Sequence, residues 1–237
     1  SSAWDCSDSS SSRRPMPSSG DFTVYPYPPS APPSPPSPPA PPSSPPSPPP
    51  LPPLQAGDCA IVGHYADDPD TVAVLLLAPM GPGQSLVVTD SEIRSGGGFG
   101  SSSSDSHETL TASADWPAGT IIKTSSLSVS SSGEDMIVYQ GTQSNPTFLC
   151  AASSRSGGFE NVPTGLTVGV NAVDLPYRDN CVYTSTMSGD PNQLRASINT
   201  YSSSRWSCTD SSSSRQSLPT TGDFTVFPYP PSAPPSP

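Results

Sequence analysis

The sequence predicts an all-β protein, an antiparallel β-sandwich with one short helix, joined to an extended polyproline II rod. Short β-branched stretches separated by Gly, Pro, Asn and Asp recur between residues 58 and 184, as in sandwiches and barrels. One stretch after Asp190 has helical spacing. The segment Pro26–Pro53 holds 18 prolines in 28 residues.

The predicted strands share β-branched and other apolar residues over four to eight positions, each bounded by turn formers. They are Asp58–His64, Thr71–Ala78, Ser85–Thr89, Thr120–Lys123, Asp135–Gln140, Thr147–Ala152, Leu166–Val170 and Cys181–Thr184. A chain of this length can bury one core of its own.

One helix is expected after Asp190. Asp190 is a good N-cap and Pro191 a good first helical residue. Apolar residues then follow at helical spacing, at Leu194, Ile198 and Tyr201.

The proline-rich segment cannot join this fold as helix or central strand. Proline fixes φ near −65° and lacks a backbone N–H, and each residue before a proline is pushed toward extended backbone. Pro26–Pro53 is therefore expected to form a stiff polyproline II rod of roughly 85–90 Å, at ~3.1 Å per residue.

The two ends of the sequence are copies of each other. Residues 1–35 match residues 203–237 at 26 of 35 positions, with a constant offset of 202. We therefore expect the chain to be a stretch of a longer tandem array. The predicted divisions are the tail of a preceding repeat unit (1–17), an extended segment and Ser/Pro rod (18–53), a disulfide-bonded sandwich (54–216), and the start of the next extended segment (217–237).

Phe22–Tyr27 (FTVYPY) is a short extended element that recurs at Phe224–Tyr229. We interpret it either as a strand that docks on each folded unit as the chain leaves it, or as the unstructured entry to the rod. Contacts between units or chains would use exposed strand edges, completed by this segment.

The cysteines become even in number once the repeat is considered, because Cys6 corresponds to Cys208. One period then holds Cys59, Cys150, Cys181 and Cys208, and Cys6 would pair outside this stretch. Four cysteines allow three connectivities; we favour Cys59–Cys150 with Cys181–Cys208. A zinc site is the alternative, but the chain has no CxxC pair. Paired disulfides predict an oxidising compartment outside the cell.

Composition excludes two classes of partner. The net charge is −11 without a Lys/Arg cluster, so nucleic acid is not expected. The longest apolar run, Val72–Ala78, is far below the ~20 residues that a membrane helix needs, so no membrane insertion is expected in this segment.

No catalytic pattern emerges, and we predict that the protein is not an enzyme. The only histidines are His64 and His107, interpreted as a strand-end and a solvated loop residue, and there is no GxSxG motif. Nothing singles out two carboxylates for glycoside hydrolysis. No cofactor is expected.

A metal site is not predicted either, although one acidic loop offers a weak calcium candidate. Asp67, Asp68 and Asp70 lie within four residues, but they lack EF-hand spacing. A solvated acidic turn is the favoured interpretation.

Two parts of the sequence, the proline-rich tract and the folded unit, each resemble a known family. The tract PPSPPSPPAPPSSPPSPPP (32–50) resembles the hydroxyproline-rich surface glycoproteins of green algae, of extensin or pherophorin type. The folded unit resembles lamin-tail-like β-sandwich repeats of extracellular proteins, in GDCAIVGHYADDPD (57–70), LVVTDSEI (86–93), WPAGTIIK (116–123), VPTGLTVGVNAV (162–173) and DNCVYT (179–184). These resemblances imply an Ig-like fold, secretion and a structural or adhesive role.

The first resemblance also implies covalent O-glycans of arabinose and galactose type, on hydroxylated prolines and on serines of the tract. The implied positions are Pro32, Pro33, Ser34, Pro35, Pro36, Ser37, Pro38, Pro39, Pro41, Pro42, Ser43, Ser44, Pro45, Pro46, Ser47, Pro48, Pro49 and Pro50. Extensins cross-link through Tyr-x-Tyr. Tyr25-Pro26-Tyr27 matches this pattern, whereas the second copy has Phe227-Pro228-Tyr229.

Together these observations predict a structural subunit of an extracellular glycoprotein fibre, in a cell wall, glycocalyx or flagellar surface. Its partners would be further copies of itself and glycans. The alternative is an adhesion or carbohydrate-binding module on a rigid stalk. An exposed aromatic platform of Trp116 and Trp206 would support that alternative, although core tryptophans are the favoured interpretation.

Overall fold

The computed structural model describes residues 20, 26, 27, 30, 32–34, 49–100 and 105–228. The chain divides into one unit of residues 1–47 and a second, folded unit of residues 48–237. Of the first unit, the described residues lie outside helix and strand, and all are exposed. Most of the predicted rod lies outside the described residues, as do residues 22–25 of the first extended element, Phe22–Tyr27.

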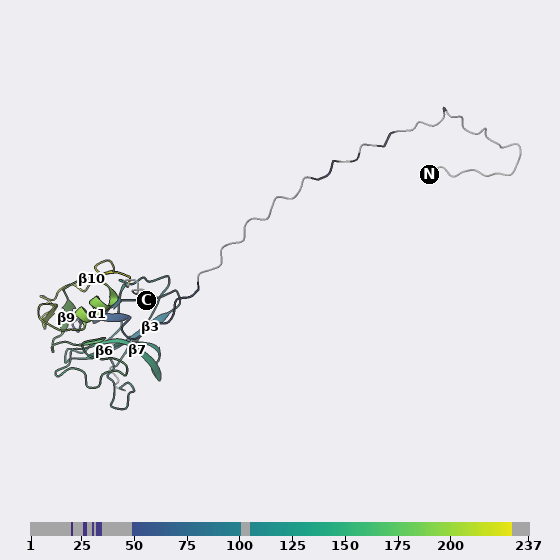
Figure 1. The fold of residues 1–237 in the computed structure, drawn as a ribbon. Helices are drawn as coiled ribbons and strands as arrows, with labels where there is room; N and C mark the ends of the chain where they lie inside the picture. The colour runs from purple at the N-terminus through teal and green to yellow at the C-terminus, as the bar shows by residue number, and fades with distance from the viewer. Residues whose placement is uncertain are drawn as a thin grey trace, which may run out of the picture. The chain divides into compact units, whose positions relative to one another are not determined.

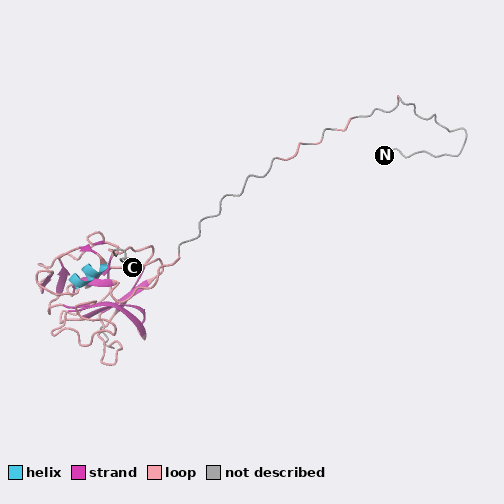
Figure 2. Cartoon of the chain, in the orientation of Figure 1, coloured by secondary structure: helices cyan, strands magenta, loops and turns pink. Residues whose placement is uncertain are grey.

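The folded unit is built mainly of β-strands, with one helix in its described part (Figures 1 and 2). The strands are β1 (Cys59–Tyr65), β2 (Thr71–Leu76), β3 (Ser85–Thr89), β4 (His107–Thr111), β5 (Ile121–Lys123), β6 (Asp135–Thr142), β7 (Asn145–Ser153), β8 (Ala172–Asp174), β9 (Asn180–Tyr183), β10 (Ser188–Gly189), β11 (Trp206–Thr209) and β12 (Thr225–Val226). The helix is α1 (Pro191–Ile198).

Two five-stranded sheets form a sandwich. The first sheet has the order β11-β9-β1-β2-β5 and the second β4-β3-β6-β7-β8, while β10 and β12 form a small separate pair. Most pairs are antiparallel, as predicted, but β7–β8 and β10–β12 are parallel. The fold is therefore a mixed sandwich rather than a purely antiparallel one.

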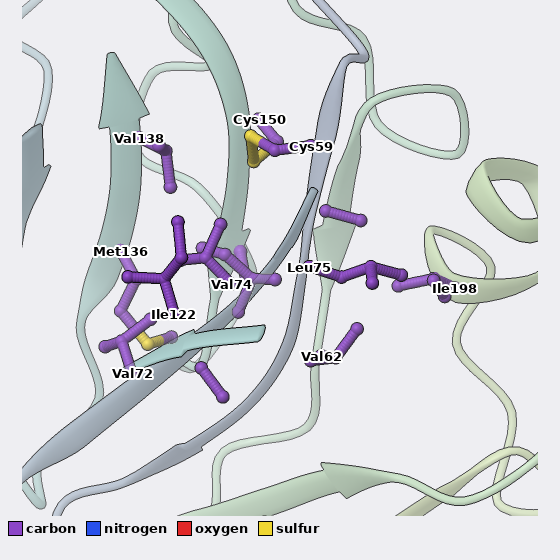
Figure 3. Packing of buried hydrophobic residues seen from close by; sticks show 14 of the residues in the cluster. Cys59, Val62, Val72, Val74, Leu75, Ile122, Met136, Val138, Cys150 and Ile198 are labelled. Carbon is purple, nitrogen blue, oxygen red and sulfur yellow. A yellow bond between two sulfur atoms is a disulfide. The ribbon is translucent and has the colours of Figure 1, made fainter. Parts of the chain in front are cut away.

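The inner faces of the two sheets share the main core. Val72 and Val74 of β2 meet Met136 and Val138 of β6 in one cluster of buried residues, which Figure 3 shows. Val72 and Val74 alternate with Ala73 and Leu75, so the two sets point to opposite faces of the first sheet. Leu75 points to the outer face, toward Ile198 of α1 (Figure 3). The first sheet is thus buried on both sides, which explains its nearly continuous apolar strands.

Helix α1 begins as the sequence predicts. The Asp190 side chain accepts hydrogen bonds from the backbone N–H groups of Asn192 and Gln193, and the Gln193 side-chain oxygen accepts one from the Asp190 N–H. This capping box satisfies N–H groups that have no partner within the helix. Leu194 and Ile198 are buried, whereas Tyr201 lies beyond the helix end and is partly exposed.

Two disulfides hold the folded unit, in the favoured pairing. Cys59 of β1 bonds Cys150 of β7 and joins the two sheets (Figure 3). Cys181 bonds Cys208 directly across the paired strands β9 and β11, and this bridge brackets helix α1. Cys6 lies outside the described residues.

Several predicted boundaries were wrong. The predicted strand Leu166–Val170 is a turn, because Gly165 and Gly169 take positive φ values of 86° and 85°, and the strand begins only at Ala172. Strands β4, β8, β10 and β11 were not predicted. The folded unit also continues past residue 216, because Leu218 and Phe224 are buried in its core.

Candidate functional site: the two anchoring points of the proline-rich segments

The chain leaves the sandwich through residues 215–228, here called the strap. At its start, the Arg215 guanidinium lies 4.0 Å from the centre of the Tyr65 ring, a favourable cation–π arrangement. The Tyr65 hydroxyl donates to the Gln216 carbonyl oxygen (2.6 Å) and accepts from the Leu218 N–H (2.9 Å). One tyrosine on the outer face of β1 therefore fixes the backbone of the strap.

Leu218 follows and covers β1 closely. Its side chain is 7% exposed, and a Cβ added to Gly63 would lie only 2.5 Å from Leu218 Cδ2. The Leu218 carbonyl oxygen also accepts from Lys123 Nζ at 3.2 Å. Gly63 is therefore the residue that leaves room for the strap on the outer face of the sheet.

Phe224 is a second buried apolar anchor of the strap, with 5% of its surface exposed. Its ring stacks on Tyr183, with 6.3 Å between ring centres, and Tyr183 in turn contacts Trp206 edge-on at 5.5 Å. Backbone hydrogen bonds flank this side chain: the Thr225 N–H donates to the Met187 carbonyl oxygen (2.8 Å) and the Phe227 N–H to that of Gly189 (2.9 Å). The strap thus ends as a strand whose aromatic residue completes the core.

The strap closes over an apolar hollow just before the proline residues resume. The hollow has a volume of about 440 Å³ and includes Pro79, Pro117, Pro191, Val226 and Phe227 in its lining. Phe227 is half exposed at its edge. The second copy of the predicted extended element therefore docks on the fold through Phe224–Phe227.

The other proline-rich segment enters the fold through Leu51–Leu54. The Gln84 side-chain amide donates to the carbonyl oxygens of Leu51 and Pro52, both at 3.0 Å. The Leu54 N–H donates to Gln140 Oε1 at 3.0 Å, and the Leu54 side chain is buried. A proline-rich backbone offers carbonyl acceptors but few N–H donors, so a glutamine amide suits it as a donor.

Few of the predicted glycosylation positions are described. Pro32, Pro33, Ser34, Pro49 and Pro50 are all exposed. The remaining positions, from Pro35 to Pro48, lie outside the described residues. In the Tyr-x-Tyr motif, Tyr27 is 97% exposed, and Tyr25 lies outside the described residues.

The acidic loop that was the weak calcium candidate makes hydrogen bonds to other parts of the folded unit. Asp67 Oδ2 accepts from Asn180 Nδ2 at 2.6 Å, and the Asp67 carbonyl oxygen accepts from Arg215 at 3.1 Å. Burial, with the nearby carboxylate of Asp68, raises the pKa of Asp70. Within the described part of the chain, no three His, Cys, Asp or Glu side chains gather as a metal site.

The two histidines are more buried than predicted. His64 lies inside β1, its Nε2 3.4 Å from the Arg178 carbonyl oxygen, and burial lowers its pKa to about 4. His107 begins strand β4 rather than lying in a solvated loop, and its Nδ1 lies 3.1 Å from the Tyr139 hydroxyl. Burial also lowers the pKa of His107. Both histidines therefore serve as packing residues of the fold.

The aromatic platform of the adhesion alternative is not formed by Trp206. This side chain is 2% exposed, and its Nε1 donates to the Ile198 carbonyl oxygen at 3.2 Å. Trp116 is partly buried and packs against the core. The favoured interpretation of Trp206 as a core residue is confirmed.

The sequence analysis did not predict an acidic hollow that lies at one end of the strands of the second sheet. Glu92, Asp105, Glu134 and Arg155 line a volume of about 390 Å³. Burial, with the charges of Asp90 and Glu92, raises the pKa of Glu134 to about 7. Arg155 pairs with Glu92 at 2.8 Å. These residues are scattered along the chain without a common motif, so the sequence contained no signal for them.

The described part of the chain holds no helix of the length and apolarity required to cross a bilayer. No protein-family model, curated protein or solved structure matches this chain.

Proposed function

We propose that this protein is a structural subunit of an extracellular fibre, in which folded β units alternate with O-glycosylated polyproline II rods. One observation carries the proposal: the fold holds the proline-rich segments on both of its sides. Leu51–Leu54 is anchored by two glutamine side chains, and the strap is anchored by buried Leu218 and Phe224. A unit held at both ends can transmit tension from one rod to the next.

The disulfides suit this role because of where they lie. Leu54 precedes Cys59 by five residues, and Leu218 follows Cys208 by ten. Each anchored segment therefore joins the fold close to a covalent cross-link, Cys59–Cys150 on one side and Cys181–Cys208 on the other. A pull on either segment reaches a disulfide before much of the fold can unravel.

The compartment follows from the same bonds. Two disulfides in one folded unit favour an oxidising environment outside the cell. A cell wall, a glycocalyx or a flagellar surface fits this, with copies of the protein and glycans as its neighbours. The resemblance to green-algal hydroxyproline-rich glycoproteins and to lamin-tail-like sandwich repeats points in the same direction.

The rods would act through the geometry of proline. A fixed φ keeps the segment extended, and O-glycans on a Ser/Pro tract keep it solvated. Spacing between folded units would then be set by the number of residues in the tract, roughly 85–90 Å for 28 residues.

Mass spectrometry of native material tests the proposal. Peptides covering residues 32–50 should carry hydroxyproline with attached pentose and hexose. Unmodified proline and serine throughout this tract would overturn the glycoprotein proposal. Electron microscopy of the same material should show globular units at regular intervals along a thin thread, and isolated globules would contradict the fibre.

A further inference from the structure

We propose that the groove occupied by the strap also accepts the segment Met16–Tyr27 of a second copy of this chain, so that copies join head to tail by strand exchange. The groove is the described surface between β1, β5, β10 and the Tyr183 ring, which residues 218–227 cover. The inference does not depend on glycosylation or on the location proposed above.

The first argument is that Met16–Tyr27 repeats the apolar side chains through which residues 218–227 contact the groove. Phe22 corresponds to Phe224, the residue stacked on Tyr183. Met16 corresponds to Leu218, which fills the space above Gly63. The aromatic residue is the same in both copies, and the one replacement, Met for Leu, is apolar and of similar volume, a swap that is well tolerated in cores.

The polar residues that contact the groove also have hydroxyl or carboxylate counterparts in Met16–Tyr27. The Thr221 hydroxyl oxygen accepts from the Ile121 N–H at 3.1 Å, and Ser19 supplies a hydroxyl at the corresponding position. Thr220 donates its N–H and its hydroxyl to the Asp223 carboxylate, at 2.7 and 2.9 Å. The first copy has Ser18 and Asp21 at the corresponding positions, with Gly20 in place of Gly222 between them.

The second argument concerns the backbone. Binding uses the N–H groups of Thr225 and Phe227, which pair with Met187 and Gly189 of the groove. Such main-chain pairing adds a strand to an edge irrespective of most side chains. In the first copy the corresponding residues are Thr23 and Tyr25, and neither is proline, so both N–H groups are present.

In the unmodified chain the resident strap has the advantage. It is tethered beside its groove, and a tether of this kind corresponds to a local concentration in the millimolar range. Exchange between copies should therefore become measurable when the strap is weakened by substitution and Met16–Tyr27 is left unchanged.

The test compares Phe224→Ala with the double variant F22A/F224A in the full chain. In F224A the groove lacks its aromatic residue, and Phe22 of another copy can supply it. We expect F224A to form dimers and larger oligomers at micromolar concentration, measured by size-exclusion chromatography with light scattering. F22A alone and F22A/F224A should both stay monomeric. A monomeric F224A would overturn the proposal.

A peptide makes recognition directly measurable. The probe is a synthetic peptide of residues 16–29, titrated into F22A/F224A by fluorescence anisotropy. We expect saturable binding of one peptide per chain, and binding roughly a hundredfold weaker for the same peptide with Phe22→Ala. Equal binding of the two peptides would contradict the proposed site.

If F224A fails to fold, judged by near-ultraviolet circular dichroism and disulfide mapping, Thr225→Pro replaces it. This variant keeps Phe224 but removes the N–H that donates to Met187. It should oligomerise as F224A does, and F22A/T225P should not.

Discussion

Before the sandwich, a proline-rich segment is held by Gln84, which donates to two of its carbonyl oxygens, and by Gln140, which accepts from the Leu54 N–H. After the sandwich, the strap contributes buried side chains and strand hydrogen bonds. The entry buries only Leu54 deeply, and Leu51 is partly exposed. The exit buries Leu218 and Phe224 and pairs β12 with β10. A polyproline segment alone has few ways to bind a fold, so strong anchoring requires that ordinary residues precede the prolines.

The segment that enters the sandwich is held less firmly than the segment that leaves it. Under tension, the Gln84 hydrogen bonds to Leu51 and Pro52, which precede buried Leu54, give way before a buried aromatic ring does. Each such bond contributes about 1 kcal/mol, whereas a buried Phe contributes several. We therefore expect the entry to loosen first and the strap to hold. The following predictions test that difference.

The largest effect should come from Phe224→Ala. Deleting a buried phenylalanine costs about 3 kcal/mol or more in free energy of unfolding, and here it also frees the strap. Urea unfolding of oxidised F22A/F224A against F22A measures the loss, because both of these proteins are expected to stay monomeric. The matched control is Phe227→Ala, three residues later and half exposed, which should cost far less. Equal losses for the two variants would refute the buried anchor.

Gly63→Ala should have the next largest effect. The new Cβ would lie 2.5 Å from Leu218 Cδ2 and 3.0 Å from the Cys181 carbonyl oxygen, and such overpacking costs about 1–3 kcal/mol. Thermal unfolding should show a lower midpoint. The control Gly96→Ala has nothing within 4 Å of the new carbon and should be near neutral. A G63A protein as stable as G96A would mean that Leu218 does not cover β1.

Gln84→Ala should weaken only the entry. It removes the donor to Leu51 and Pro52 and the acceptor of the Gly81 N–H, at a cost of about 1 kcal/mol. Amide exchange at Gly81 should become faster, while exchange at Thr225 stays unchanged. Gln143→Ala, at an exposed turn position, is the control. Faster exchange at Thr225 in Q84A would show that the two anchors are coupled.

Acid should lower the free energy of unfolding of the whole folded unit, and so affect both anchors, through protonation of His64. Its pKa is about 4 in the folded state and 6.5 as an ordinary histidine, so the unfolded state binds the proton first as the pH falls. Stability present above pH 6.5 is therefore lost progressively toward pH 4, by roughly 3 kcal/mol in all. Because Glu134 shifts in the opposite sense, the measurement is the difference between the wild type and His64→Gln across this range. A difference independent of pH would contradict the neutral buried histidine.

Much of the fold could be predicted from local patterns. Seven of the eight predicted strands overlap observed ones, and the N-cap at Asp190 placed the helix. Leu166–Val170 was wrong because two glycines turn the chain there. Strand β4 (HETLT) was missed because its polar residues suit a half-buried edge strand and lack an apolar signal.

Of the two anchoring points, the sequence predicted one and not the other. The repeat of Phe22–Tyr27 at Phe224–Tyr229 indicated that this segment could dock on the fold. No sequence pattern indicated the anchoring role of Gln84 and Gln140, because that role depends on where the sheet places them relative to Leu51 and Leu54. Contacts between residues 32 to 86 positions apart arise from tertiary structure alone.

Hydrogen exchange of the full chain, resolved by residue, tests the difference between the two anchors most directly. The account predicts that the amides of Leu218, Thr225 and Phe227 exchange only when the sandwich itself opens, as core amides do. The Leu54 amide should exchange sooner, through local release of the entry segment. Exchange at Thr225 and Phe227 faster than at Leu54 would contradict the account, because the strap would then be a loose tail.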